Sequence, residues 1–244
     1  MRIEQFDTLP STNQYCELLN LDETEEFTVI VARTQTAGIG QRGNHWEAET
    51  GKNLTFSIVL KPIWLPIADQ YQLTKVVSLG IADCLMPLFA EGERRVRIKW
   101  PNDIYVDNNK ICGILITHRI ANGQIAASVV GIGLNVNQQT FPDWVPNPTS
   151  LHLLTGHQWA LDKMLEKVLD CIAYRYNELH NNPIGSLDEP YLSILLRRDE
   201  EAQYSYHGKT ITATILDVNR FGHLQLVTGK GERLSCQLKE IQFL

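Results

Sequence analysis

A lysine, an amide and a carboxylate stand close together in residues 99–103 (KWPND). The alternating pattern of residues 96–100 predicts a strand, which the proline turn ends. Side chains of these three kinds at a strand end can orient a polar ligand, although an edge strand with Trp100 packed in the core would show the same pattern. Lys110 follows on the expected return strand of a hairpin, close to Gly113, where a ligand could approach the backbone.

Residues 38–43 (GIGQRG) match the GxGxxG pattern of dinucleotide-binding sites. Such a site needs a helix directly after the glycines, because the helix N-terminus faces the pyrophosphate. Here residues 44–53 lead into the β-rich residues 54–60 instead, which excludes that site. A kinase-type glycine loop is excluded because the chain has no HRD or DFG motif. Two alternatives remain: a flexible turn, or a loop whose backbone N–H groups approach an anionic ligand.

A third polar segment, residues 131–137 (GIGLNVN), ends a predicted strand with two glycines and two asparagines. Asparagine can pair with the edge of an adenine or support a metal-bound phosphate, and it is also an ordinary turn residue. Trp144 lies in the proline-rich loop predicted over residues 138–150, where it could stack on a base or fix the loop in place. Neither feature identifies a ligand by itself.

Hydrophobic patterns predict the elements that must position these segments. Residues 11–13 form a polar cap before a helix-compatible stretch at residues 14–19. We expect further helices at residues 69–89, 161–179 and 191–198, and strands at residues 27–32, 54–60, 96–100, 104–106, 110–116 and 125–132.

The sequence changes character after Asp199. Short β-rich runs are separated by turn signals at residues 207–209, 219–222 and 229–231. A spacing of roughly ten residues between turns predicts a small antiparallel barrel. We therefore expect two domains, a catalytic domain over residues 1–197 and a small C-terminal domain over residues 198–244.

Composition narrows the class of protein. The 244 residues carry a net charge of −6, which argues against a nucleic-acid binder. The first residues lack the layout of a signal peptide, and no uninterrupted apolar run approaches the ~20 residues of a membrane span. The five cysteines are scattered without a CxxC pair, as is typical of reduced thiols in a cytoplasmic protein. The seven histidines form no HxxxH or HxH pair, so the sequence identifies no metal ligands.

Taken together, these segments closely resemble the biotin–protein ligase family. The matching segments occur in order as Ser11-Thr12-Asn13, residues 35–46 (QTAGIGQRGNHW), residues 99–103, Lys110 with Gly113, and residues 131–137. The close resemblance covers residues 8–155, and the C-terminal part fits more loosely. It implies an α+β fold: a mixed β-sheet catalytic domain of the biotin/lipoate ligase type, followed by an SH3-like β-barrel.

The resemblance also implies an activity. Members of the family form biotinyl-5'-AMP from biotin and ATP, with Mg²⁺ as activator. They then transfer biotin to a lysine of the biotin carboxyl carrier protein of a biotin-dependent carboxylase. The expected enzyme is thus a biotin–[biotin carboxyl carrier protein] ligase in the cytoplasm, with no DNA or membrane partner, and a homodimer is compatible with the resemblance.

Residue roles follow from the same resemblance. Ser11, Thr12 and Gln35 match residues around the ureido ring of biotin, and Lys110 matches the lysine that contacts the biotin carboxylate and the α-phosphate. Asn135 and the loop after it match the adenine side, with Trp144 a weaker match. The full set expected to bind biotin or the adenylate is Ser11, Thr12, Asn13, Gln35, Gly38, Ile39, Gly40, Gln41, Trp46, Lys110, Gly113, Gly133 and Asn135.

The glycine-rich loop departs from the family pattern. Relatives commonly carry Gly-Arg-Gly-Arg, whereas this chain has Ile39 and Gln41 at the two arginine positions and Arg42 beside the second. We therefore expect Arg42, with Lys110, to contribute to catalysis, by anchoring the loop through Glu47 or Glu49. Solvation of Arg42, with Gln41 sufficient, is the alternative.

Other functions fit part of the pattern. A lipoate-class acyl ligase or transferase has the same fold, and Cys112 could serve as its nucleophile, although a mid-strand cysteine is more often buried. A repressor that also ligates biotin would need an N-terminal helix-turn-helix, and the ligase motifs already begin at residue 11. A non-catalytic biotin-binding protein would not need Lys110 together with residues 99–103.

Overall fold

The computed structural model describes residues 1–244 apart from the side chain of Arg42. The α-helices are α1 (Thr12–Leu18), α2 (Tyr71–Leu85), α3 (Leu151–Thr155), α4 (Leu161–Asn181) and α5 (Asp188–Ser193), and the short 3-10 helices are η1 (Gln41–Gly43), η2 (Ile67–Asp69) and η3 (Met86–Phe89). The strands of the larger sheet are β1 (Arg2–Leu9), β2 (Thr28–Gln35), β3 (Leu54–Leu60), β4 (Val96–Lys99), β5 (Asp103–Val106), β6 (Asn109–Ala121) and β7 (Gln124–Leu134).

These seven strands form one mixed sheet in the order β1-β2-β3-β7-β6-β5-β4. β1 and β2 run parallel and the other neighbours are antiparallel. The predicted hairpin around residues 107–108 is confirmed. β6 and β7 are longer than predicted, because Asn122 and Gly123 both have positive φ and form a tight turn of the kind that Asn-Gly favours.

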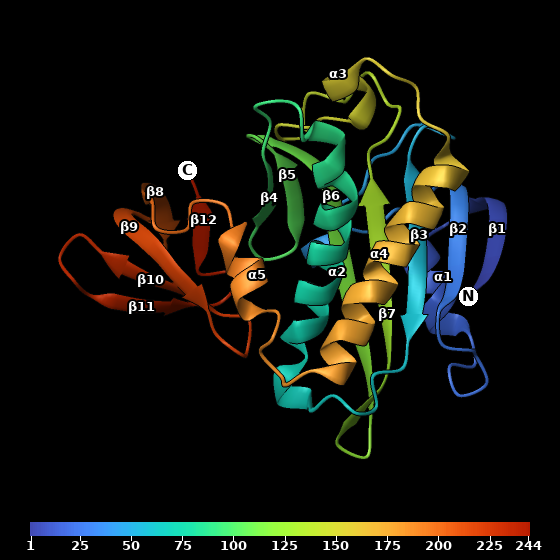
Figure 1. Cartoon of the computed structure of the whole chain (residues 1–244), viewed down its shortest axis with the longest axis horizontal. Helices are drawn as coiled ribbons and strands as arrows, with labels where there is room; N and C mark the ends of the chain where they lie inside the picture. Colours follow the sequence, from blue (N-terminus) through green and yellow to red (C-terminus); the bar gives the residue numbers. More distant parts are fainter.

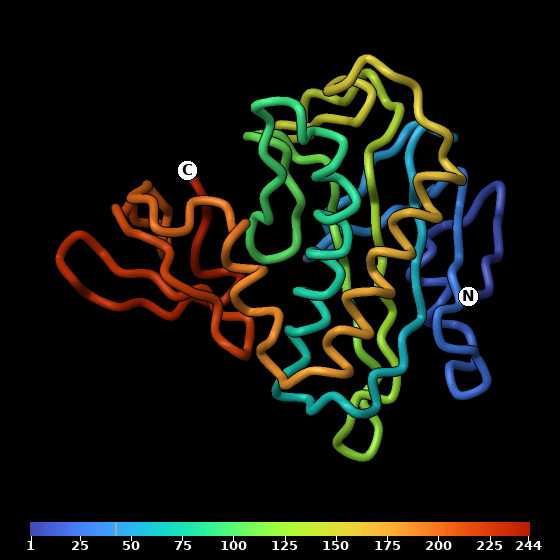
Figure 2. Tube along the Cα trace, in the orientation of Figure 1, coloured from blue at the N-terminus to red at the C-terminus, as the bar shows by residue number. Residues whose placement is uncertain are grey.

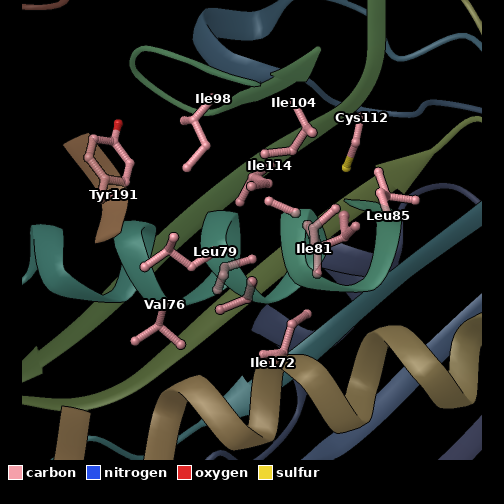
Figure 3. Packing of buried hydrophobic residues seen from close by; sticks show 14 of the residues in the cluster. Val76, Leu79, Ile81, Leu85, Ile98, Ile104, Cys112, Ile114, Ile172 and Tyr191 are labelled. Carbon is pink, nitrogen blue, oxygen red and sulfur yellow. The ribbon is translucent and has the colours of Figure 1, made fainter. Parts of the chain in front are cut away.

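Helices α2 and α4 cover one face of this sheet (Figure 1). Figure 3 shows part of this apolar core, in which Leu79 and Leu85 of α2, Ile104 and Ile114 of the sheet and Ile172 of α4 belong to one cluster. The segment Ile67–Phe89 is long and apolar enough to span a membrane by length and composition, but 72% of its most apolar window is buried inside the fold. That burial is typical of a core helix.

The other face is only partly covered. Helix α1 packs there against β2, β3 and β7, with Cys16 at the centre of a smaller cluster that includes Ile30 and Val129. Ser11 is the N-cap of α1, as predicted, and its hydroxyl accepts a hydrogen bond from the backbone N–H of Gln14. Because α1 is short, the sheet beside it remains open on this face.

The C-terminal strands form a second, antiparallel sheet. They are β8 (Glu201–Tyr206), β9 (Lys209–Val218), β10 (Leu224–Thr228), β11 (Arg233–Cys236) and β12 (Ile241–Phe243), in the order β11-β10-β9-β8-β12. The predicted fold class is confirmed, although this sheet is not a closed barrel. It lies at the opposite end of the molecule from β1 (Figure 2). The domain boundary at residue 197 stays a prediction, since the core side chains of the two sheets belong to one continuous cluster.

One strand was not predicted and one helix differs from its prediction. Strand β1 was not predicted, because it is a mostly exposed edge strand and its sequence has little hydrophobic contrast. The helix expected at residues 191–198 instead begins at Asp188 and ends at Ser193. The chain then becomes extended, and the backbone around Leu195 pairs with Ile98 on the edge strand β4. Sheet pairing outcompetes helix continuation at that point.

Candidate active site

A cavity of about 500 Å³ opens on the face of the large sheet that α1 leaves uncovered. It collects segments that lie far apart in the sequence. Of the residues predicted to bind biotin or the adenylate, those that line it are Ser11, Thr12, Asn13, Gln35, Ile39, Gly40, Gln41, Trp46, Lys110, Gly113 and Gly133. The structure therefore brings together eleven of the thirteen predicted binding residues, and Gly38 and Asn135 lie outside the lining.

The floor of the cavity is made of small residues on three neighbouring strands. Gly133 of β7 pairs with Gly113 of β6, and Gly131 of β7 pairs with Ser57 of β3. Successive side chains of a strand point to opposite faces, so the intervening Ile132 points into the apolar core while the glycines face the cavity. Glycine at these positions keeps the floor open.

One end of the cavity is a network of buried polar groups. The side-chain oxygen of Gln35 accepts hydrogen bonds from the backbone N–H (2.7 Å) and hydroxyl (3.1 Å) of Thr12. The hydroxyl of Ser57 lies 2.7 Å from that of Thr12 and donates to the side-chain oxygen of Asn13 at 2.5 Å. Any side chain on Gly131 would collide with that oxygen of Asn13. This network is preorganised to recognise a polar ligand group.

The glycine-rich loop folds back over the cavity. The backbone N–H of Trp46 donates to Gly38 at 3.0 Å, and Ile39 pairs with His45. A Cβ on Gly38 would come within 2.6 Å of the Trp46 carbonyl oxygen. Gly38 thus supports the loop from outside the cavity. The side chain of Arg42 lies outside the described residues, so its catalytic role stays a prediction.

The loop presents the indole of Trp46 to the glycine floor. Its ring lies where side chains on Gly113 and Gly133 would stand, and a Cβ on Gly113 would come within 2.9 Å of the ring. The indole N–H is buried and has no hydrogen-bond partner among the described residues. A buried donor without a partner is costly, so it is well placed to bind a ligand.

The other end of the cavity is charged. The ammonium group of Lys110 lies 2.7 Å from a carboxylate oxygen of Asp103, and both side chains are about three-quarters buried, with 25% and 22% exposed. The backbone of Lys110 is fixed by hydrogen bonds to Asn147 and Thr149 in the loop before α3. The ammonium group also lies 5.7 Å from the centre of the Trp46 ring. Lys110 therefore lies between the glycine floor and the glycine-rich loop, which forms the lid of the cavity.

A second lysine, Lys99, faces the same end. Its ammonium group lies 3.2 Å from the hydroxyl of Tyr105 and 5.2 Å from the centre of the Phe243 ring. Burial lowers the pKa of Lys99, and burial raises the pKa of Tyr105 to about 12, so the phenol is neutral at pH 7. Lys99 has no carboxylate within ion-pair distance among the described residues, and Asp103, whose charge acts on it, is paired with Lys110. A half-buried cation whose nearby carboxylate is shared with another lysine favours an anionic ligand.

Asn135 lies behind the loop that follows β7. Its amide donates to the carbonyl of Thr149 at 3.0 Å, and its side-chain oxygen is buried without a partner among the described residues. Asn135 thus holds the loop next to Lys110, and its role toward adenine stays a prediction. Trp144 is 59% exposed, at a ring distance of 6.4 Å from His45.

Cys112 has no access to the cavity. It is fully buried in the apolar core on the opposite face of β6, and burial raises the pKa of its thiol. A nucleophilic cysteine needs a low pKa and exposure to the substrate. The structure thus gives no support to an acyl transferase that uses Cys112.

Several residues of the site were not predicted. Leu238, Ile241 and Phe243 come from the C-terminal sheet, and Pro146 comes from the proline-rich loop. Nothing in their local sequence indicates a ligand, since apolar residues in short C-terminal strands usually pack inside the sheet to which they belong. Only the packing of the second sheet against the first reveals their position.

The fold and this site define a class of protein. The mixed sheet carries a floor of small residues, a polar network and two lysines, and a glycine-rich loop covers them. This arrangement can hold a substrate that has both a neutral polar group and an anionic group. The match to the model of the biotin/lipoate A/B protein ligase family covers residues 5–135. The chain belongs to that family.

Individual relatives are similar over parts of their length. The bifunctional ligase/repressor BirA of Bacillus spizizenii is 30% identical over 191 residues, which cover 76% of this chain and 58% of that protein. The biotin–[acetyl-CoA-carboxylase] ligase of Paracoccus denitrificans is 34% identical over 148 residues, 59% of each chain. The chain thus spans less than two-thirds of these relatives.

The fold as a whole also has a close match. The structure of the biotin protein ligase from Aquifex aeolicus in complex with biotin and ATP superposes with a TM-score of 0.82 at 24% identity. The match covers 100% of this chain and 99% of that one, so both sheets have the same arrangement in the two proteins.

Proposed function

We propose that the chain is an ATP-dependent biotin–protein ligase that forms biotinyl-5'-AMP and transfers biotin to a lysine of a biotin carboxyl carrier protein. One observation carries this proposal. The polar network of Thr12, Asn13 and Gln35, which contacts Gly131, and the lysines Lys99 and Lys110, of which Lys110 contacts Gly113, line one cavity at different places on its glycine floor. Biotin has a polar ureido ring at one end and a carboxylate at the other.

The polar end favours biotin over lipoate or octanoate. A ureido ring both donates and accepts hydrogen bonds, whereas the distal end of an octanoyl or lipoyl chain does neither. Binding such a chain would bury the network around Gln35 and Ser57 against apolar atoms, so its polar groups would lose water without gaining hydrogen bonds from the ligand. The open glycine floor accommodates the apolar middle of either ligand.

The lysine end fits the adenylation step. The biotin carboxylate attacks the α-phosphorus of ATP, the bond to the bridging oxygen breaks, and pyrophosphate leaves. Both reactants are anionic, so a cation between them relieves their repulsion and stabilises the charge of the transition state. Lys110 is positioned for this role by its ion pair with Asp103, and Lys99 supplies a second positive charge.

The proposal includes Mg²⁺ as activator. Asp103 is the carboxylate that lines the cavity among the described residues, and no cluster of three metal-ligating side chains occurs among them. This donor set fits Mg²⁺, which often takes one or two carboxylates and completes its shell with phosphates and water. When bound, Mg²⁺ would neutralise phosphate charge, with Asp103 as its protein ligand.

The second step needs an acceptor lysine beside the mixed anhydride. Lysine nitrogen attacks the acyl carbon, an amide forms and AMP leaves. The carrier protein brings its lysine to the open face of the cavity, and placement of the two groups supplies much of the acceleration. The scattered free cysteines support a cytoplasmic location, and the net charge of −6 supports an absence of DNA binding.

Mass spectrometry tests the transfer. The protein, biotin, ATP and Mg²⁺ are incubated with an isolated biotin carboxyl carrier domain, and we expect the carrier to gain the mass of one biotinyl group. A carrier whose acceptor lysine is replaced by arginine should gain none. No mass gain on the unaltered carrier, with a known ligase active in a parallel reaction, would refute the proposed transfer.

A further inference from the structure

The turn between β9 and β10, residues 219–223, is built as a rigid unit. The side-chain oxygen of Asn219 accepts hydrogen bonds from the backbone N–H groups of Phe221 and His223, each at 3.0 Å. Backbone bonds join Asn219 to Gly222 at 2.8 Å and to His223 at 3.0 Å. This turn connects two strands of the C-terminal sheet, yet it contacts η2, α2 and the segment 99–103.

The turn contacts the segment 99–103 directly. The indole N–H of Trp100, which is buried, donates to the carbonyl of Gly222 at 2.9 Å. Gly222 has a φ of +83°, and a side chain there would collide with the ring of Tyr71. The hydroxyl of Tyr71 donates to the carbonyl of Pro101 at 3.1 Å. Gly222 thus contacts both Trp100, which belongs to the segment 99–103, and Tyr71, which bonds to the segment at Pro101.

An ion pair fastens the turn to η2. The guanidinium of Arg220 binds both carboxylate oxygens of Asp69, at 3.2 and 2.9 Å. The Asp69 side chain is only 5% exposed. The Arg220 side chain is 56% exposed, so the main contribution of the bidentate pair is its fixed geometry. The pair fixes the orientation of the turn relative to the start of α2.

Backbone and side-chain bonds hold the two sides of the segment, where Ile98 pairs with Ile194 and Leu196, and Asn102 bonds to Ile114 of β6. Pro101, between them, has no N–H to donate. Yet Lys99 and Asp103, at its two ends, form the charged end of the cavity, and Asp103 holds Lys110. The polar end, in contrast, is built from α1, β2 and β3, which the turn does not touch.

We propose that residues 219–223 are a clasp that positions Lys99 and Asp103 for the adenylation step, and that Trp100, Tyr71, Gly222 and Arg220 are positioning residues. The inference rests on the proposed function. It predicts that loosening the clasp weakens the binding and reaction of ATP more than the binding of biotin, whose ureido ring is held by the polar network at the other end of the cavity.

Two variants test the clasp. Trp100→Phe keeps an aromatic ring but removes the bond to Gly222, and Arg220→Ala removes the ion pair with Asp69. Lys230→Ala, in the exposed turn between β10 and β11, is the matched control. Each variant is assayed by biotin-dependent ATP–pyrophosphate exchange, by calorimetric titration with biotin, and by hydrogen exchange of residues 99–105.

In both clasp variants we expect the KM for ATP to rise about tenfold, because one lost charged or buried bond is worth roughly that factor. The biotin Kd should rise by a clearly smaller factor, because the polar network still holds the ureido ring, and backbone exchange at residues 99–105 should accelerate. Arg220→Lys should restore part of the KM. Unchanged KM for ATP and unchanged exchange of residues 99–105 in Trp100→Phe would overturn the proposal, as would equal losses of ATP and biotin binding.

Failure of the proposed function is distinguishable from failure of the clasp. If the unaltered protein shows no biotin-dependent exchange, the ligase assignment fails, and hydrogen exchange alone then decides the clasp. Faster exchange of residues 99–105 in both variants, but not in Lys230→Ala, supports it. Equal exchange in all of them refutes it.

Discussion

The indole of Trp46 lies on Gly133, in the space that any side chain on that residue would occupy. The two residues are 87 positions apart in the sequence, one in the glycine-rich loop and one on the central strand β7. Because Gly133 has no side chain, the ring of Trp46 rests directly on the floor of the cavity, and the glycine-rich loop and the floor form one surface. The contact also includes Gly113 on the neighbouring strand.

Gly133→Ala tests this contact. The added methyl group must displace the Trp46 ring, and overpacking of this kind typically costs ~1–3 kcal/mol. We expect biotin binding to weaken by about tenfold, measured by calorimetric titration. Gly229→Ala is the control, since a Cβ there would meet nothing within 4 Å. Equal biotin affinity in the two variants would show that the lid does not depend on the glycine floor.

Lys110→Ala tests the charged end of the cavity. Its ammonium group is the one that Asp103 holds at 2.7 Å. We expect adenylation to fall about a hundredfold or more, since loss of one stabiliser of transition-state charge typically costs ~3 kcal/mol. Pyrophosphate exchange measures the loss, with the exposed Lys163→Ala as the control. Near-normal exchange in Lys110→Ala would place the catalytic charge elsewhere.

Arg42→Ala tests the loop that lacks the usual arginines. We expect it to release biotinyl-adenylate faster, because charge-assisted bonds are the strong ones in such an anchor. Stopped-flow fluorescence measures the release, and labelling of bystander lysines should increase. Adding Gln41→Arg to this variant should suppress part of the leak. An unchanged release rate in Arg42→Ala would mean that Gln41 suffices.

His118 gives a prediction about pH. Its ring lies 2.9 Å from the hydroxyl of Ser128, and burial lowers its pKa below the ordinary value of 6.5. The unfolded chain therefore binds this proton more readily, and folding stability falls as the pH drops from about 6.5 toward the folded pKa. We expect His118→Gln to lose less stability between pH 7.5 and pH 5 than the unaltered protein, measured as urea midpoints.

The same measurement has a clear contrary result. If the two proteins lose stability in parallel over this range, His118 does not contribute to acid sensitivity. A change in the urea midpoint on His118→Gln that is the same at pH 7.5 and at pH 5 would reflect altered packing only.

The parts of the fold and site that the sequence predicts are those with a local signature. The strand at residues 54–60, the hairpin beside Lys110 and the cap at Ser11 all follow from periodicity or turn chemistry within a few residues. The binding residues were predicted by resemblance, and most of them line one cavity.

What the sequence does not reveal is long-range. The bond from Trp100 to Gly222 joins residues 122 positions apart, and the approach of Phe243 to Lys99 depends on how the second sheet packs. No periodicity encodes such contacts. The bond from Asn135 to Thr149 is likewise not indicated by its sequence context, and the role of Asn135 toward adenine stays a prediction. Edge strand β1 lacks the alternation that marks a half-buried strand.

Biotin-dependent ATP–pyrophosphate exchange tests the central claim most directly. The purified protein is mixed with ATP, Mg²⁺ and labelled pyrophosphate, and exchange is compared with biotin, with lipoate, with octanoate and with no acid. The paired polar network at Thr12 and Gln35 and the cationic end at Lys110 predict rapid exchange with biotin and background rates with the other acids. Exchange with lipoate or octanoate, and none with biotin, would contradict the account.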